Sequence, residues 1–175
     1  TAGNHLQFVL QQAVIGIGSG LVILGTQYRG QNRTRPIRRL SAIAMWFGIT
    51  AGFLLFAATW LFPRQLLELF TYDKAIIAEG MSYLETIRWS YLFFVISVIL
   101  METLRAVEIV RISLYVAIIG LIANFGINFV LIFGRFGFPE MGIRGAGIGT
   151  LTARALELAA VLIFLWKKGG ALKLR

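Results

Sequence analysis

The sequence contains no cysteine, a single histidine (His5) and three prolines among its 175 residues. Without cysteine there is no disulfide framework, no thiol nucleophile and no cysteine-ligated metal site. His5 stands alone near the start of the chain, without a partner for catalysis or metal binding. Nowhere do a nucleophile, a base and an orienting group converge. We therefore expect no enzymatic activity, no metal site and no cofactor.

Apolar residues, in contrast, are abundant: 58% of the chain is hydrophobic and the mean hydropathy is +0.78. A soluble domain of this size needs a larger polar shell. The runs 6–28, 40–62 and 112–134 carry no formal charge, and the run 145–166 carries only Arg154 and Glu157. Each is longer than the roughly 18 residues that a bilayer crossing requires. The sequence thus predicts an all-α, polytopic membrane helical bundle.

A fifth crossing, at residues 83–104, has weaker support. Only residues 89–101 are free of formal charge, and a helix of that length spans about 20 Å, less than the hydrocarbon core. Arg88 and Glu102 would have to extend toward the interfaces for the segment to cross. Whether residues 83–104 cross the membrane is decided by how the charges are distributed between the apolar segments.

The net charge of +9 comes from bases in the gaps between apolar runs, which is typical of membrane topology signals rather than of nucleic-acid binding. With five crossings, one side receives Arg29, Arg33, Arg35, Arg38, Arg39, Arg105, Arg111, Lys167, Lys168, Lys173 and Arg175. The other side receives only Arg64, Lys74, Arg135 and Arg144, together with Glu68, Asp73, Glu79 and Glu140. Without the fifth crossing the two sides would be nearly even. The positive-inside rule therefore favours five helices, with residues 29–39 cytoplasmic and Thr1 outside. An outside start without a signal sequence predicts at least one further helix upstream.

Two shorter features predict an interfacial helix and close contacts between helices. Residues 64–71 mix charged and apolar residues at helical spacing, which predicts an amphipathic helix at the outer interface. Glycines four residues apart at 16 and 20, 48 and 52, and 145 and 149 predict close helix–helix contacts. Neither glycine-rich string completes a nucleotide-binding fingerprint.

Polar side chains deep within apolar helices are the candidate functional residues, because hydrocarbon penalises them. Asn124 and Asn128 lie four residues apart on one helix face. Their amides are suited to binding a cation or a ligand, and equally to bonding a neighbouring helix.

Arg154 and Glu157 are spaced to form an ion pair that braces the helix, and Glu157 would be titratable if that pair opened. Gln11 and Gln12 either face a water-filled cavity or bond a neighbour.

Four segments resemble the multidrug and toxic compound extrusion (MATE) transporters. They are GTQYRGQN at 25–32, PRQLLELFTYD at 63–73, MSYLETIRWSY at 81–91 and ANFGINFVLIFGRFGFPEMGIRGAGIGT at 123–150. The last resembles the fifth and sixth helices of that family closely and is quite specific. Many members carry Asp where Asn128 stands, whereas the NorM-like branch has this Asn-X-X-X-Asn form. Asn cannot carry a proton, which argues against proton coupling through this position.

The resemblance implies that residues 1–175 are a partial amino-terminal lobe, about helices two to six of a twelve-helix secondary antiporter in the plasma membrane. Its implied activity is export of organic, often cationic, compounds in exchange for sodium ions or protons. The partners would be the lipid bilayer, small-molecule substrates, and the missing first helix and carboxy-terminal lobe of the same protein, but no nucleic acid. Two alternatives remain: a lipid-linked-sugar flippase of the same superfamily, whose cavity typically holds several cationic residues, and a non-transporting membrane scaffold.

Overall fold

The computed structural model describes residues 2–70 and 72–168, and all regular structure within them is helical. The helices are α1 (Ala2–Gly30), α2 (Thr34–Leu61), α3 (Pro63–Glu68), α4 (Lys74–Ile87), α5 (Ser90–Ala106), α6 (Val110–Phe133) and α7 (Gly142–Lys168). The expected all-α, polytopic architecture is confirmed. Thr1, Lys173 and Arg175, which entered the charge count, and position 71 of the predicted interfacial helix lie outside the described residues.

Four helices are long and apolar enough to cross a membrane: Gln7–Gly30, Arg35–Leu61, Val110–Phe133 and Gly142–Lys167. Backbone groups in hydrocarbon must be bonded internally, and long charge-poor runs meet that demand as uninterrupted helices. The predicted runs 40–62 and 112–134 reach one residue beyond the ends of α2 and α6. A fifth crossing is counted when α4 and α5 are taken as one bent span.

The predicted helix at 83–104 is divided between α4 and α5, which meet at Arg88 and Trp89 with a bend of 54°. At this break the indole of Trp89 packs edge-on against Phe56 of α2, with ring centroids 5.1 Å apart. The bend turns α4, whose Lys74, Glu79 and Glu85 are exposed, away from the axis of the apolar α5.

The interfacial segment begins one residue earlier and ends earlier than expected. Pro63 occupies the first turn of α3, where its missing N–H costs nothing, and buried Leu67 fixes this short helix to α4. Helix α4 then begins separately and is capped by Asp73, whose carboxylate accepts a hydrogen bond of 2.8 Å from the Ala75 N–H.

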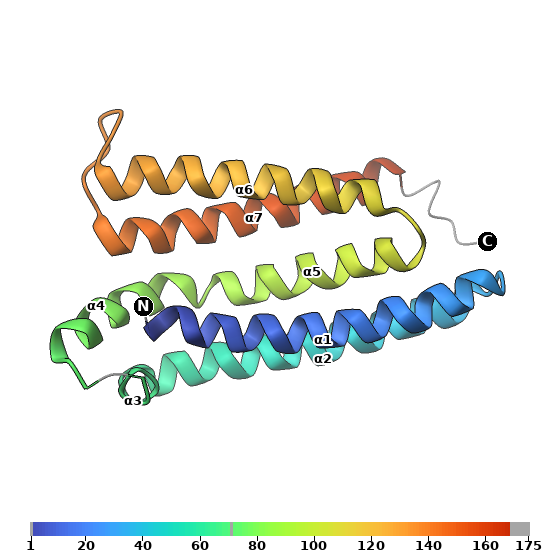
Figure 1. The fold of residues 1–175 in the computed structure, drawn as a ribbon, viewed down its shortest axis with the longest axis horizontal. Coiled ribbons are helices and arrows are strands. Elements are labelled where there is room, and N and C mark those ends of the chain that lie inside the picture. Colours follow the sequence, from blue (N-terminus) through green and yellow to red (C-terminus); the bar gives the residue numbers. More distant parts are fainter. Residues whose placement is uncertain (1, 71, 169–175) are drawn as a thin grey trace.

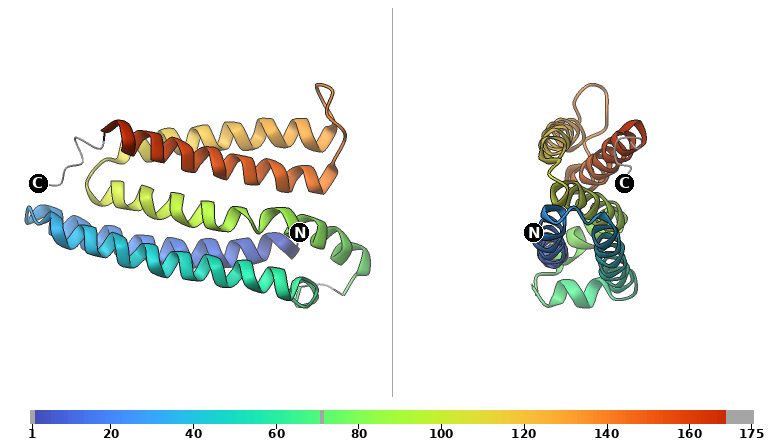
Figure 2. Two further views of the ribbon diagram at one scale, coloured as in Figure 1. Left: turned by 180° about the vertical axis from the view of Figure 1, so that it is seen from behind. Right: turned by 90° about the vertical axis from the view of Figure 1, so that its right-hand side faces the viewer.

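The helices form two antiparallel hairpins, α1–α2 and α6–α7, with α5 lying between them (Figures 1 and 2). One buried apolar cluster joins α5 to α1–α4, and Val14, Tyr91 and Val95 are among its most buried members. A smaller cluster joins α5 to α6 and α7 through Leu104, Val116 and Val161. The central position of α5 is why it carries the most buried residues of any spanning segment.

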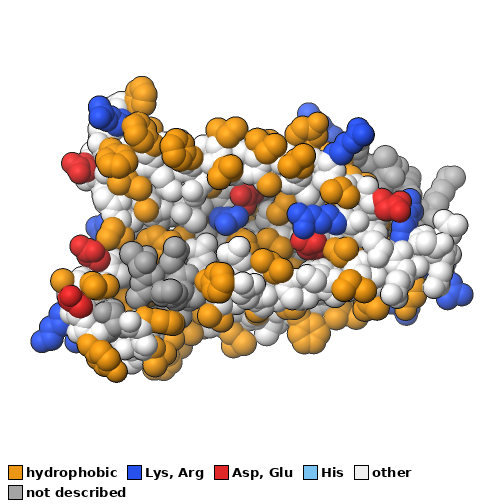
Figure 3. Space-filling view, viewed as in Figure 1, with side chains coloured by type: hydrophobic (Ala, Val, Ile, Leu, Met, Phe, Trp, Pro, Cys, Tyr) orange, Lys and Arg blue, Asp and Glu red, His pale blue; other side chains and the backbone are white. Residues whose placement is uncertain are grey.

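The outer faces of the bundle are apolar, as expected for a multi-pass membrane protein. Large exposed side chains include Trp46, Phe47, Ile122 and Phe125. Figure 3 shows hydrophobic side chains along the length of the molecule, charged ones at its two ends, and a small charged group partway along this face.

Two of the three glycine pairs make close contacts. Gly48 and Gly52 of α2 lie against α5, and Gly145 and Gly149 of α7 lie against α6. The expectation is wrong for Gly16 and Gly20, because a Cβ at either position would meet nothing within 4 Å. They lie on the exposed face of α1, while Gly18 and Gly25 face α5.

Candidate functional site

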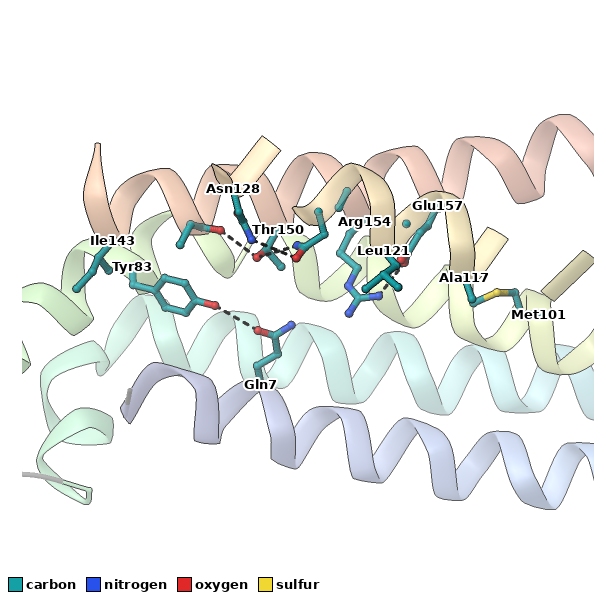
Figure 4. Close-up of a pocket in the computed structure, with 14 residues that line it drawn as sticks. Gln7, Tyr83, Met101, Ala117, Leu121, Asn128, Ile143, Thr150, Arg154 and Glu157 are labelled. Atoms are coloured by element: carbon teal, nitrogen blue, oxygen red, sulfur yellow. Dashed lines mark hydrogen bonds and ion pairs between the residues drawn. The ribbon is translucent and has the colours of Figure 1, made fainter. Parts of the chain in front are cut away.

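A pocket of about 620 Å³ lies between the two hairpins, within the range of small-molecule sites. It is lined by Gln7, Tyr83, Met101, Ala117, Gly120, Leu121, Asn124, Asn128, Ile143, Ala146, Thr150, Ala153, Arg154 and Glu157. These residues come from α1, α4, α5, α6 and α7, so the bend between α4 and α5 and the α6–α7 hairpin both shape the site (Figure 4).

Asn124, Asn128 and Thr150 form a row of neutral polar groups in the pocket. The Asn128 amide donates to Asn124 Oδ1 at 3.1 Å, and the Asn124 amide donates to Thr150 Oγ1 at 3.4 Å. The Thr150 hydroxyl donates in turn to the backbone oxygen of Ala146 at 2.9 Å. The row ends at Asn128 Oδ1, a buried acceptor without a hydrogen-bond partner. An unpaired acceptor of this kind is suited to binding a cation or an N–H donor.

Gly149 lets the Asn128 amide lie close to α7. A Cβ at position 149 would overlap Asn128 Oδ1 and lie 3.0 Å from the Asn128 side-chain carbon Cγ. Alanine at this position would therefore push the amide away from the row. The third predicted glycine pair thus serves the site as well as helix packing.

Arg154 and Glu157 form an ion pair in the same pocket, with 2.7 Å between Arg154 Nη1 and Glu157 Oε2. Their side chains are 25% and 11% exposed, respectively. The guanidinium also lies over the ring of Phe94 on α5, 4.8 Å from the ring centroid, in cation–π geometry. The brace proposed from the spacing is present, and it lies inside the pocket.

Gly120 of α6 makes room for the Glu157 carboxylate. A Cβ at position 120 would overlap Glu157 Oε1 and approach the carboxylate carbon Cδ at 2.6 Å. One carboxylate oxygen therefore bonds Arg154 while the other lies against the α6 backbone.

The end of the pocket nearest α4 is formed by Tyr83 and Gln7, whose hydroxyl and Oε1 atoms are 3.5 Å apart. Gln11 and Gln12 do not line the pocket: Gln11 is half-buried and Gln12 is exposed. Their role as cavity residues stays a prediction. Gln7 lies one turn before Gln11 on the same side of α1.

Sequence reasoning missed Gln7, Tyr83 and Thr150. Thr150 had a usable signal, because residues 146, 150, 153, 154 and 157 recur at helical spacing and share one face of α7. Tyr83 had none, since it lies on α4, at the weakly supported start of the predicted crossing at 83–104, and reaches the pocket through the fold of the bundle.

No group of three or more His, Cys, Asp or Glu side chains within residues 2–70 and 72–168 is placed to hold a metal ion. The pocket instead offers neutral oxygen atoms, a paired carboxylate and a paired guanidinium. This set can bind a cation or an amphiphilic organic molecule without covalent chemistry.

A family model described as MatE matches residues 1–130. A relative named "Probable multidrug resistance protein NorM" from Xylella fastidiosa strain Temecula1 is 27% identical over 167 residues, which are 95% of this chain and 35% of the relative. A protein of the same name from Rhizobium meliloti is 29% identical over 151 residues, covering 86% of this chain and 32% of the relative. "Probable multidrug resistance protein YoeA" from Bacillus subtilis is 25% identical over 163 residues, covering 93% of this chain and 35% of the relative. The chain spans about a third of the length of these relatives.

Proposed function

The chain belongs to the MatE family, and from that premise we propose that it forms part of the cavity of a secondary antiporter in the plasma membrane. The complete protein exports organic, often cationic, compounds in exchange for sodium ions or protons. Residues 1–175 form part of its amino-terminal half, and the remaining walls come from the rest of the transporter. Rocking of the two halves exposes the cavity to each side of the membrane in turn.

The observation that carries this proposal is a polar pocket in a bundle whose outer faces are apolar. Asn124, Asn128 and Thr150 turn inward from helices that otherwise expose large apolar side chains. Polar groups within a membrane are costly unless they bond to each other or serve a function. Asn128 Oδ1 has no partner, so bonding between helices does not account for the whole row.

We assign Asn124, Asn128 and Thr150 the role of neutral ligands for the substrate or the coupling ion. A bound sodium ion or a donor N–H group on a substrate would complete the coordination of Asn128 Oδ1 and remove the cost of burying it unpaired.

The charges of the pocket give an anionic ligand no net attraction, because they cancel. Arg154 is the one base among the lining residues in the described part of the chain, and Glu157 compensates its charge. A flippase for anionic lipid-linked sugars would need several uncompensated bases here, so this alternative is the less favoured one.

Export by the complete protein in lipid vesicles tests the proposal, with ethidium as a permanently charged organic cation. We expect ethidium to move against its gradient when an inward gradient of protons or sodium ions is imposed. Asn128→Leu should slow export on the order of tenfold, because losing a hydrogen bond and leaving Asn124 under-bonded costs about 1–3 kcal/mol.

The matched control is Gln31→Leu, which removes an exposed amide in the loop between α1 and α2, and it should export at the parent rate. Vesicles in which no gradient drives ethidium movement would support the scaffold alternative. Normal export by Asn128→Leu would exclude the amide row from the site.

A further inference from the structure

A second pocket, of about 400 Å³, lies at the turn between α1 and α2. We call it the turn pocket; it shares no lining residue with the pocket between the hairpins. We infer that the turn pocket binds a phospholipid with a net negative charge, whose phosphate lies between Arg35 and Arg39 and whose acyl chains continue along α2. The lining residues are Tyr28, Arg35, Pro36, Arg39, Leu40 and Ile43.

Arg35 and Arg39 carry positive charge that no acidic side chain compensates. They are one helical turn apart on α2, so their side chains are neighbours, and both are exposed. Neither forms an ion pair with another residue of the described part of the chain. Like charges at this spacing repel each other. A phosphate that bonds both guanidinium groups removes that repulsion and is held by charge-assisted hydrogen bonds.

The α1–α2 hairpin supplies no counter-charge of its own. Residues 1–67 contain no Asp or Glu. The first turn of α2 likewise has no acidic residue, and Arg33 before it makes no capping hydrogen bond through its side chain. Bases near a helix N-terminus are unfavourably placed with respect to the helix dipole. An external anion therefore compensates charge that the protein itself leaves uncompensated.

The apolar side chains beyond the arginines favour a lipid over a soluble anion. Ile43 lines the turn pocket and is 52% exposed. Trp46, which is 75% exposed, follows Arg35 by eleven residues and Arg39 by seven, and both spacings return to the same face of a helix. This face of α2 thus begins with two bases and continues with large apolar groups. A phospholipid has the complementary order of charge and hydrocarbon, whereas free phosphate matches only the arginines.

Tyr28 completes the turn pocket from α1, where it is half-buried. Its hydroxyl can donate a hydrogen bond to a phosphate oxygen, and tyrosine favours the boundary between hydrocarbon and headgroups. The turn between α1 and α2 lies at one end of the bundle, and charged side chains gather at the two ends (Figures 1 and 3). The turn pocket therefore lies at the depth of the lipid headgroups.

The test uses the complete protein in lipid vesicles and the fluorescence of Trp46. This indole is about 16 Å along α2 from Arg35, at the depth of the acyl chains. Lipids with brominated acyl chains quench a neighbouring tryptophan, and the difference between the parent and Trp46→Phe isolates the signal of Trp46. Brominated phosphatidylglycerol and brominated phosphatidylcholine, each diluted into the other lipid, give the relative binding constant beside Trp46.

This constant should favour phosphatidylglycerol on the order of thirtyfold in the parent, because two bases act on the anionic headgroup. Arg35→Gln combined with Arg39→Gln should abolish the preference. The matched control is Arg29→Gln combined with Arg33→Gln, which removes the same charge from the same turn outside the turn pocket. The control should keep most of the parent preference.

Three results would overturn the inference: no preference in the parent, an unchanged preference without Arg35 and Arg39, or an equal loss in the control. An equal loss would mean that the whole turn attracts anionic lipid diffusely. Arg35→Lys combined with Arg39→Lys tests whether charge is responsible. It should retain most of the preference, because an ammonium group also attracts phosphate. A loss as complete as in the glutamine variant would contradict binding through charge.

Inorganic phosphate distinguishes a lipid site from a site for a free anion. Sodium phosphate and sodium chloride at equal ionic strength should weaken the preference equally, because both act by screening. Abolition of the preference by phosphate alone would overturn the assignment to a lipid. None of these measurements depends on export, so a complete protein that fails to transport ethidium still decides whether the turn pocket binds an anionic phospholipid.

Discussion

Asn128 has an unequally bonded amide: its NH₂ group donates to Asn124 while its carbonyl oxygen is buried without a donor. Aspartate has nearly the same shape but replaces the NH₂ donor by an oxygen and can carry a proton. We expect Asn128→Asp to add a step to the pH profile of ethidium export, with rates changing on the order of tenfold across it.

This step should be absent from Asn128→Leu, which adds no ionisable group. A profile identical to that of the parent would show that position 128 does not contact the transported cation or the coupling ion. The measurement is the initial export rate from vesicles as a function of internal pH.

For single residues, the sequence was informative wherever a polar side chain would be costly to place in hydrocarbon. Asn124, Asn128, Arg154 and Glu157 were selected because polar groups in hydrocarbon need a reason, and all four line the pocket. The glutamines show the limit of the argument: hydropathy locates a polar residue along a helix but not around it. Gln7 faces the pocket and Gln12 faces outward, and the packing of α1 against α2, α4 and α5 decides between them.

The crossing of α2 over α5 depends on the absence of a side chain at Gly48. A Cβ there would meet Val95 and Ile99, both fully buried. We expect Gly48→Ala to destabilise the protein by about 1–3 kcal/mol, because neither neighbour has room to move. The measurement is the midpoint of thermal unfolding in detergent.

Gly16→Ala is the matched control, since it adds the same methyl group to a helix of similar length where nothing lies within 4 Å. Its unfolding midpoint should equal or slightly exceed that of the parent, because alanine favours helix over glycine. A similar loss in both variants would mean that helix propensity and not the α2–α5 contact governs the effect.

At the scale of helices, the sequence did not predict the break between α4 and α5. Charges at Arg88 and Glu102 indicated a weak crossing, but no proline or glycine lies near the break to predict a bend. The bend depends on distant partners: Phe56 against Trp89, and Leu67 packed beside Gly80. Those contacts exist only in the folded bundle.

The connections between helices alternate between the two ends of the molecule. The turns after α1 and α5 lie at one end with the end of α7, while α3 and the α6–α7 loop lie at the other (Figure 1). We expect cysteines introduced at Arg35 and Tyr72, which are both exposed, to react with a membrane-impermeant thiol reagent from opposite sides. The first should react only from the cytoplasmic side.

Labelling of both positions from outside would refute the five-crossing topology. At the scale of the molecule, composition was sufficient to predict an all-helical polytopic bundle, because that architecture follows from transfer into lipid. The number of five crossings stays a prediction, since four helices qualify by themselves and a fifth is counted only when α4 and α5 form one bent span. The grouping into two hairpins around α5 required side-chain contacts, such as Gly48 against Ile99, that no hydropathy pattern encodes.

The pocket takes its walls from both ends of the described chain, from Gln7 on α1 to Glu157 on α7. During synthesis, α6 therefore leaves the ribosome before α7 can supply Thr150, and Asn124 and Asn128 enter the membrane with only each other to bond. A nascent chain stopped after α6 presents this amide pair to lipid or to the insertion machinery. Completion of α7 is thus the step that supplies the Thr150 hydroxyl as a partner for the Asn124 amide.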